Sequence, residues 1–117
     1  MTTVILDTNA LLMPFQFNIN LDRELQRLFG DPEVYVPSSV MDELRELNRK
    51  NALALAKKYK EISVEKPRDD GVLEAAEKIN AVIVTNDKEL KKTAKEKGIT
   101  VVFLRKKSYL AVEGEHI

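Results

Sequence analysis

The sequence predicts a three-layer α/β/α fold, with helices on both faces of a mainly parallel central sheet of four to five strands. Several short runs are wholly apolar, without the polar alternation of a half-exposed strand, which is typical of strands buried on both faces. Helical segments separate these runs, and this order produces parallel strands. The chain has 117 residues, 44% of them hydrophobic, so we expect a single domain over residues 1–117.

In the first half of the chain, polar turn residues mark the ends of the apolar runs. The first run stops at Asp7, and the second ends in Pro37 and is followed by two serines. In order, the pattern predicts a strand at Val4–Leu6, an irregular segment at Met13–Phe17, a helix near Leu21–Phe29, a strand at Val34–Pro37, and helices at Val40–Leu47 and Asn48–Ile62.

The second half repeats the alternation of helix and strand. A helix from Asp69 to Asn80 leads into an apolar strand at Ala81–Val84, which stops at a second polar turn. A basic helix then runs to Lys97, where Gly98 ends it. The run Ile99–Leu104 is a fourth strand, and Tyr109–Val112 is the candidate for a fifth.

Composition excludes several kinds of chemistry. The chain has no cysteine, so it has neither disulfides nor a thiol nucleophile, and its one histidine, His116, is the penultimate residue. Any catalysis must therefore depend on carboxylates. No segment approaches 18 continuous apolar residues, so we expect a cytoplasmic protein without a membrane span. The 19 basic and 19 acidic residues sum to zero, which taken alone argues against nucleic acid as a partner.

Carboxylates follow three of the predicted strands. Asp7 comes directly after the first, Glu43 lies early in the helix after the second, and Asp87 comes after the third. Ligands of open parallel sheets bind at this carboxyl edge. Asp69 and Asp70 open the helix that leads into the third strand, and a crossover helix should begin near the same edge. We therefore expect these acids to lie close together.

Helical phase, at about 100° per residue, narrows the choice of residues. Glu43 borders the apolar stripe of its helix, whereas Asp42 points away from it. Asp69 likewise lies on the apolar side of its helix and Asp70 does not. Each acid also has a structural alternative: Asp7 in an Asx turn, Asp87 as a helix N-cap, or Asp42 in a capping box with Ser39, three residues earlier.

Four clustered carboxylates would repel one another and resist burial. Helix N-termini would offset only about 0.3–1 kcal/mol for each group. A divalent cation that prefers oxygen ligands would hold the cluster together, and Mg²⁺ or Mn²⁺ suits a site without Cys or His. Such ions activate water and stabilise the leaving oxygen of a phosphodiester.

Four segments together resemble the PIN domain family: Ile5–Asn9, Pro37–Leu44, Asp69 with its apolar helix, and Val84–Asp87. The resemblance spans nearly the whole chain. It implies an α/β/α nuclease that cuts RNA with Mg²⁺ or Mn²⁺. By position, it assigns metal binding and catalysis to Asp7, Glu43, Asp69 and Asp87, with Asp70 as the alternative to Asp69. Asn9 and Thr85 match supporting polar positions that orient the carboxylates or water.

Two stretches, 45–68 and 88–107, each hold eight Lys or Arg residues. In the second stretch, four lysines lie within an arc of roughly 100° on one helix, opposite its apolar residues Leu90 and Ala94: Lys88, Lys91, Lys92 and Lys95. The alternative for one such helix is an ordinary solvated face. Beside a carboxylate cluster, the residues become candidates for RNA binding: Lys88, Lys91, Lys92, Lys95, Arg105, Lys106 and Lys107.

The resemblance leaves the biological role open. The C-terminal half is more similar to PIN proteins of small-subunit rRNA processing, because the extension Lys106–Gly114 follows the fourth strand. VapC-type toxins share the acids, and the resemblance allows an antitoxin or ribosome-assembly partner and a homodimer. Two rivals use the same features differently: a non-catalytic RNA-binding or assembly module, and a receiver-like domain. The receiver is disfavoured because Asp7 has no adjacent acid.

Overall fold

The computed structural model describes residues 1–114, and the remaining residues, with His116 among them, lie outside this range. One six-stranded sheet has the order β3-β2-β1-β4-β5-β6, in which β6 alone is antiparallel. The predicted α/β fold with a mainly parallel sheet is confirmed, with one strand more than the four to five expected. The strands are β1 (Thr3–Leu6), β2 (Glu33–Pro37), β3 (Lys60–Ile62), β4 (Val82–Val84), β5 (Val101–Arg105) and β6 (Tyr109–Val112).

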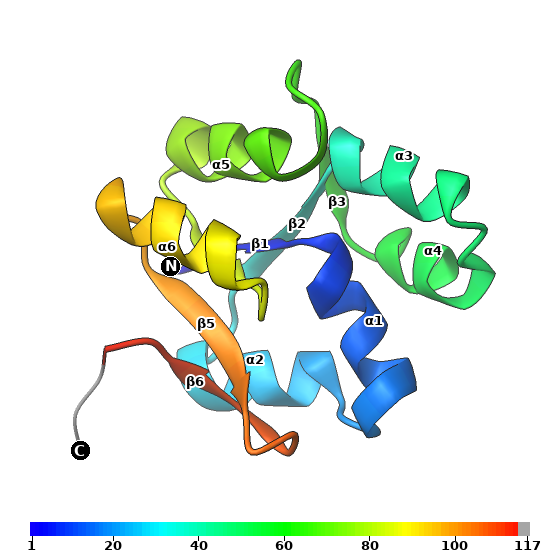
Figure 1. Ribbon diagram of the computed structural model, residues 1–117. Coiled ribbons are helices and arrows are strands. Elements are labelled where there is room, and N and C mark those ends of the chain that lie inside the picture. The colour runs from blue at the N-terminus through cyan, green and yellow to red at the C-terminus, as the bar shows by residue number, and fades with distance from the viewer. Residues whose placement is uncertain (115–117) are drawn as a thin grey trace.

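Helices cover both sides of the sheet (Figure 1). Helix α5 packs across β1, β2 and β4 and α6 packs on β5, whereas α1 contacts β1 and α2 contacts β6. The helices are α1 (Thr8–Phe17), α2 (Leu21–Phe29), α3 (Ser38–Glu46), α4 (Lys50–Ala56), α5 (Arg68–Ile79) and α6 (Lys88–Glu96). The central strand β1 is buried from Val4 to Leu6, as its wholly apolar sequence predicts.

The expectation of an irregular segment at Met13–Phe17 is wrong, because these residues complete α1. Helix α1 contains Pro14, which removes one backbone hydrogen bond from a helix interior. Burial of Leu11 and Met13 against the core outweighs that loss. Asn18 then ends the helix in the left-handed conformation.

The single helix expected at Asn48–Ile62 is also wrong. Helix α4 ends at Ala56, and the chain continues as β3, which pairs in parallel with Tyr35–Pro37 of β2. An apolar pattern that includes Tyr59 and Ile62 fits a helical period, so local periodicity does not reveal the strand. Pairing with β2 buries Ile62, and this contact exists only in the folded chain.

None of the helices within residues 1–114 is long and apolar enough to cross a membrane.

Candidate active site

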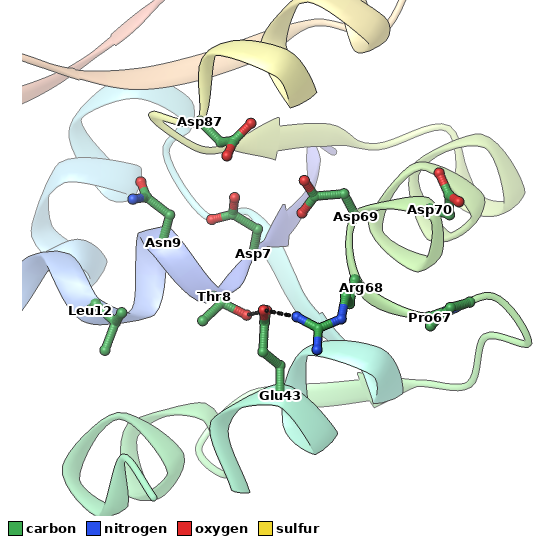
Figure 2. A pocket seen from close by; sticks show the side chains of 10 residues that line it. All are labelled: Asp7, Thr8, Asn9, Leu12, Glu43, Pro67, Arg68, Asp69, Asp70 and Asp87. Atoms are coloured by element: carbon green, nitrogen blue, oxygen red, sulfur yellow. Dashed lines mark hydrogen bonds and ion pairs between the residues drawn. The ribbon is translucent and has the colours of Figure 1, made fainter. Parts of the chain in front are cut away.

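The carboxyl edge of the sheet carries a cavity of about 530 Å³ (Figure 2). Its walls come from the starts of α1, α5 and α6 and from the middle of α3. All four predicted metal ligands line it, together with Asp70 and Asn9. The lining residues are Asp7, Thr8, Asn9, Leu12, Glu43, Pro67, Arg68, Asp69, Asp70 and Asp87.

Asp7 stands between β1 and α1 and is the N-cap of α1. Its Oδ1 accepts a 2.7 Å hydrogen bond from the Ala10 backbone N–H. The residue is 3% exposed. Burial raises the pKa of Asp7 to about 7, the like charges of Asp69 and Asp87 add to the rise, and hydrogen bonds from Thr85 and Ala10 oppose it. Asp7 is therefore a buried carboxyl that lacks a nearby positive charge strong enough to offset its burial.

Asp87 occupies the matching position at the start of α6. Its Oδ1 accepts a 2.8 Å hydrogen bond from Leu90 N–H, so the N-cap alternative is correct. Thr85, fully buried, fixes the turn because its Oγ1 accepts from Asp87 N–H at 3.0 Å. In both Asp7 and Asp87, Oδ1 caps the helix, and both residues also line the cavity. Capping and a functional role are thus compatible for these two acids.

Glu43 reaches the cavity from α3, on the side that helical phase predicts. Its Oε1 accepts from the Thr8 hydroxyl, and its Oε2 lies 3.3 Å from Nη1 of Arg68. Asp42, one residue earlier, is exposed and pairs with Arg45 at 3.2 Å. The expected capping box of Ser39 and Asp42 is wrong, because Pro37 is the N-cap of α3 and no side chain caps this helix.

Asp69 and Asp70 both line the cavity, in different ways. Figure 2 shows the Asp69 carboxylate directed toward Asp7, whereas Asp70 lies farther along α5. Partial burial raises the pKa of Asp69, and the negative charges of Asp87, Glu43 and Asp70 raise it further. The placement favours Asp69 over Asp70 as the member of the cluster.

A close approach of α5 to α3 brings Asp69 and Glu43 to one cavity. The Ser39 hydroxyl donates to the Arg68 carbonyl at 3.2 Å. Gly71 faces the same contact, and a Cβ there would lie 2.4 Å from both Ser39 Oγ and the Lys66 carbonyl oxygen. Only glycine fits at this position without displacing the start of α5.

Asn9 lies at the cavity wall, where it joins α1 to the turn after β4. Its Oδ1 accepts from Asn86 N–H at 2.9 Å, while Asn86 Oδ1 accepts from Leu104 N–H at 2.6 Å. Asn9 therefore holds the backbone of the turn after β4. Thr85 contacts both Asp7 and Asp87, the N-caps of α1 and α6. Sequence patterns do not single out Asn86, although it lies between Thr85 and Asp87 in the polar run after β4.

The donor chemistry of the cavity fits a hard divalent cation, because every candidate ligand is a carboxylate oxygen. The raised pKa of buried Asp7 indicates a site that a positive charge would stabilise. Within residues 1–114, no group of three or more His, Cys, Asp or Glu side chains already stands at metal-holding positions. Glu43 is held by the Thr8 hydroxyl and by Arg68.

The lysines predicted to bind RNA on α6 fall into two groups, exposed ones and one that already contacts other side chains. Lys88, Lys92 and Lys95 are exposed on α6. Lys91 instead lies 3.8 Å from Glu113 and 4.8 Å from the ring centre of Phe103, so it is already partnered. The last residue of β5 and the first two residues of its turn to β6 (the hairpin tip) expose three more basic side chains: Arg105, Lys106 and Lys107.

The hairpin tip has an unusual backbone. Lys106 and Lys107 adopt φ values of 53° and 55°, and Ser108 N–H closes the turn on the Arg105 carbonyl at 3.0 Å. Central turn positions with positive φ favour Asn and Gly. Two lysines therefore occupy positions where the backbone prefers other residues, and their charged ends project at the tip.

Two more cavity residues escaped sequence reasoning. By sequence, Thr8 belongs only to a polar turn and Arg68 only to a basic stretch. Both contact Glu43, which lies far away in the sequence. A hint was available for Arg68, since it directly precedes Asp69.

These features define the class as an α/β domain whose acids meet at the carboxyl edge of a parallel sheet. The chain belongs to the PIN-like domain family, whose model matches residues 4–107, and this confirms the predicted resemblance. It is 32% identical to Ribonuclease VapC9 of Archaeoglobus fulgidus, over 93% of this chain and 87% of that protein. It is 33% identical to Ribonuclease VapC4 of Methanocaldococcus jannaschii, over 97% and 98% of the two chains.

A solved structure supports the fold independently. The PIN domain endonuclease Utp24 superposes with a TM-score of 0.81 at 24% sequence identity, over 95% of this chain and 90% of that one. The central sheet and its helices are thus those of a PIN domain.

Proposed function

We propose that this protein is a Mg²⁺- or Mn²⁺-dependent endoribonuclease that hydrolyses RNA phosphodiester bonds. The observation that carries the proposal is the single cavity lined by Asp7, Glu43, Asp69 and Asp87. Membership of the PIN-like family and the two ribonuclease relatives support the choice of RNA as substrate.

Asp7, Glu43, Asp69 and Asp87 would hold the cation. The chemistry that bound Mg²⁺ or Mn²⁺ supplies is activation of water and stabilisation of charge on phosphate oxygens. The protein's own contribution is orientation: N-capping through Oδ1 fixes the side chains of Asp7 and Asp87 at the cavity that both residues line. Thr85 and Asn9 hold the turns that carry these acids.

A cleavage assay tests the proposal. Wild type and Asp7→Asn should be compared on single-stranded and structured RNA with Mn²⁺, and we expect Asp7→Asn to lose about 10²-fold or more in rate. Asn retains the oxygen that accepts from Ala10 N–H, so the α1 cap is kept. Asp70→Asn is the matched control in the same cavity and should keep its rate within about threefold. Equal activity of wild type and Asp7→Asn would reject the assigned site.

We propose that RNA reaches the cavity across the exposed basic residues Lys88, Lys92 and Lys95 of α6 and those of the hairpin tip. Phosphate groups would pair with these side chains in a salt-dependent way. Lys91 has a smaller part in this surface, because Glu113 and Phe103 already engage it.

The biological role is proposed between two alternatives, rRNA processing and a VapC-type toxin. The match to the VapC4 relative covers 97% of this chain, so the extension Lys106–Gly114 does not distinguish the two roles. An antitoxin would be the partner in the toxin role and a ribosome-assembly factor in the processing role, with the protein in the cytoplasm and able to form a homodimer. Growth arrest on expression of wild type, absent with Asp7→Asn, would select the toxin.

A non-catalytic RNA-binding module is the second candidate. It is favoured by one observation, the exposed basic residues of α6 and of the hairpin tip, which suit a phosphate backbone whether or not RNA is cut. If the protein bound RNA but neither cleaved it nor bound Mn²⁺, the nuclease proposal would be rejected in favour of this module.

A further inference from the structure

Within residues 1–114, Arg68 is the one basic side chain that lines the carboxylate cavity. Its Nη1 lies 3.3 Å from Glu43 Oε2, and its Nη2 lies 3.7 Å from Glu46 Oε2 (Figure 2 shows the contact with Glu43). Glu43 is also one of the four proposed metal ligands. The guanidinium therefore occupies a carboxylate oxygen that a divalent cation would require.

The backbone aims Arg68 at this position. Its φ is 50°, in the left-handed region that non-glycine residues rarely adopt. The Ser39 hydroxyl donates to the Arg68 carbonyl, and the missing Cβ of Gly71 lets the same turn pack against α3. The turn is thus set by tertiary contacts rather than by the preference of arginine, and the side chain begins beside Glu43.

The ion pair between Arg68 and Glu43 is weak enough for a divalent ion to replace Arg68. The Arg68 side chain is 70% exposed and that of Glu43 is 22% exposed, so solvent screens their attraction. The other oxygen of Glu43 accepts from the Thr8 hydroxyl, so both oxygens of this carboxylate are engaged. A divalent ion, with twice the charge and a preference for oxygen ligands, would compete directly for Glu43.

We propose that Arg68 is a competing cation for Glu43, which neutralises this carboxylate in the metal-free protein and leaves it when a divalent ion binds. The proposal rests on the metal-dependent function proposed above. Arg68 acts through Glu43 and is therefore a positioning residue. When it is released, its fork of N–H donors becomes free at the mouth of the same cavity.

Mn²⁺ binding to the full chain without RNA, measured by calorimetry or by the spectrum of the free ion, tests the proposal. If an exposed ion pair holds Glu43 for most of the time, removing the guanidinium should raise Mn²⁺ affinity by about three- to sixfold. Arg68→Gln removes the charge and keeps a polar, although shorter, side chain. Arg68→Asn removes the charge while suiting the left-handed backbone, so a folding defect of Arg68→Gln would not leave the proposal undecided.

Lys66→Gln is the matched control, because Lys66 lies two residues earlier in the same loop and is not among the residues lining the cavity. It should change Mn²⁺ affinity by less than about twofold if contact with Glu43, rather than general charge, is responsible. Unchanged affinity in both Arg68 variants, or an equal rise in Lys66→Gln, would overturn the role of Arg68 while the metal-dependent function stands. Absence of Mn²⁺ binding in wild type and in both Arg68 variants would instead reject the proposed function, and the role of Arg68 with it.

Discussion

At the scale of single residues, the site depends on side chains with two tasks. Asp7 and Asp87 each cap a helix through one carboxylate oxygen and also line the cavity. Sequence patterns identified both residues but treated capping and function as alternatives. In the structure the same residue can have both roles. A residue between the end of a strand and the start of a helix lies at the carboxyl edge of the sheet and also in the N-cap position.

Asp7 should make the stability of the metal-free protein depend on pH. Its pKa of about 7 in the folded protein lies above the ordinary value of 3.8 for an aspartate, so the folded protein binds more protons between these pH values. The free energy of unfolding should therefore fall as pH rises from about 4 to about 7, by up to about 4 kcal/mol. Asp7→Asn should lose this part of the pH dependence and be more stable than wild type above pH 7, as measured by urea denaturation with a chelator.

Asp70→Asn is the control for this pH dependence, because Asp70 is exposed in the same cavity. If wild type and Asp7→Asn show parallel stability profiles across this range, burial of Asp7 does not have the predicted effect.

At the scale of elements, the placement of α5 against α3 assembles the cavity. Glu43 and Asp69 both line the cavity, as expected from the apolar stripes of their helices, but so does Asp70, which helical phase places away from the stripe. Helical phase did not predict how closely the two helices approach. That distance depends on Ser39 and Gly71, which lie 32 positions apart in the chain and meet only after folding.

Gly71→Ala should therefore destabilise the protein. In an open helix interior, the exchange of glycine for alanine stabilises by about 0.5–1 kcal/mol. Here the added Cβ would meet Ser39 and the Lys66 carbonyl, so we expect a loss of about 1–3 kcal/mol in urea denaturation. If Gly71→Ala instead raised the free energy of unfolding, α5 would be free to shift away from Ser39, which would contradict the prediction.

At the scale of the whole molecule, the zero net charge conceals an uneven distribution. Acids gather in the cavity at the carboxyl edge of the sheet, where the positive ends of α1, α5 and α6 also lie. Exposed lysines follow along α6 from that edge. The formal sum therefore carries little information about nucleic acid, because RNA would meet local surfaces rather than the total charge.

The α6 surface should contribute to the salt dependence of RNA binding. Replacing Lys88, Lys92 and Lys95 together by Gln should weaken binding and reduce the slope of log affinity against log salt by up to about 2 for single-stranded RNA. Lys78→Gln/Lys97→Gln is the control, because these lysines lie at or just past the C-terminal ends of α5 and α6, away from the cavity. A triple variant with the wild-type slope would return the α6 lysines to an ordinary solvated surface.

The sequence by itself determined the alternation of buried strands and helices, and it placed acids after three of the strands. Both are local properties: wholly apolar runs such as Val4–Leu6 report burial on two faces, and a polar residue directly after them marks the strand end. Only the tertiary structure decided that Lys60–Ile62 is a strand, that Gly71 and Ser39 join two helices, and that Arg68 contacts Glu43. These features depend on residues far apart in the chain, whose contacts form when the sheet is assembled and leave no periodic trace in the sequence.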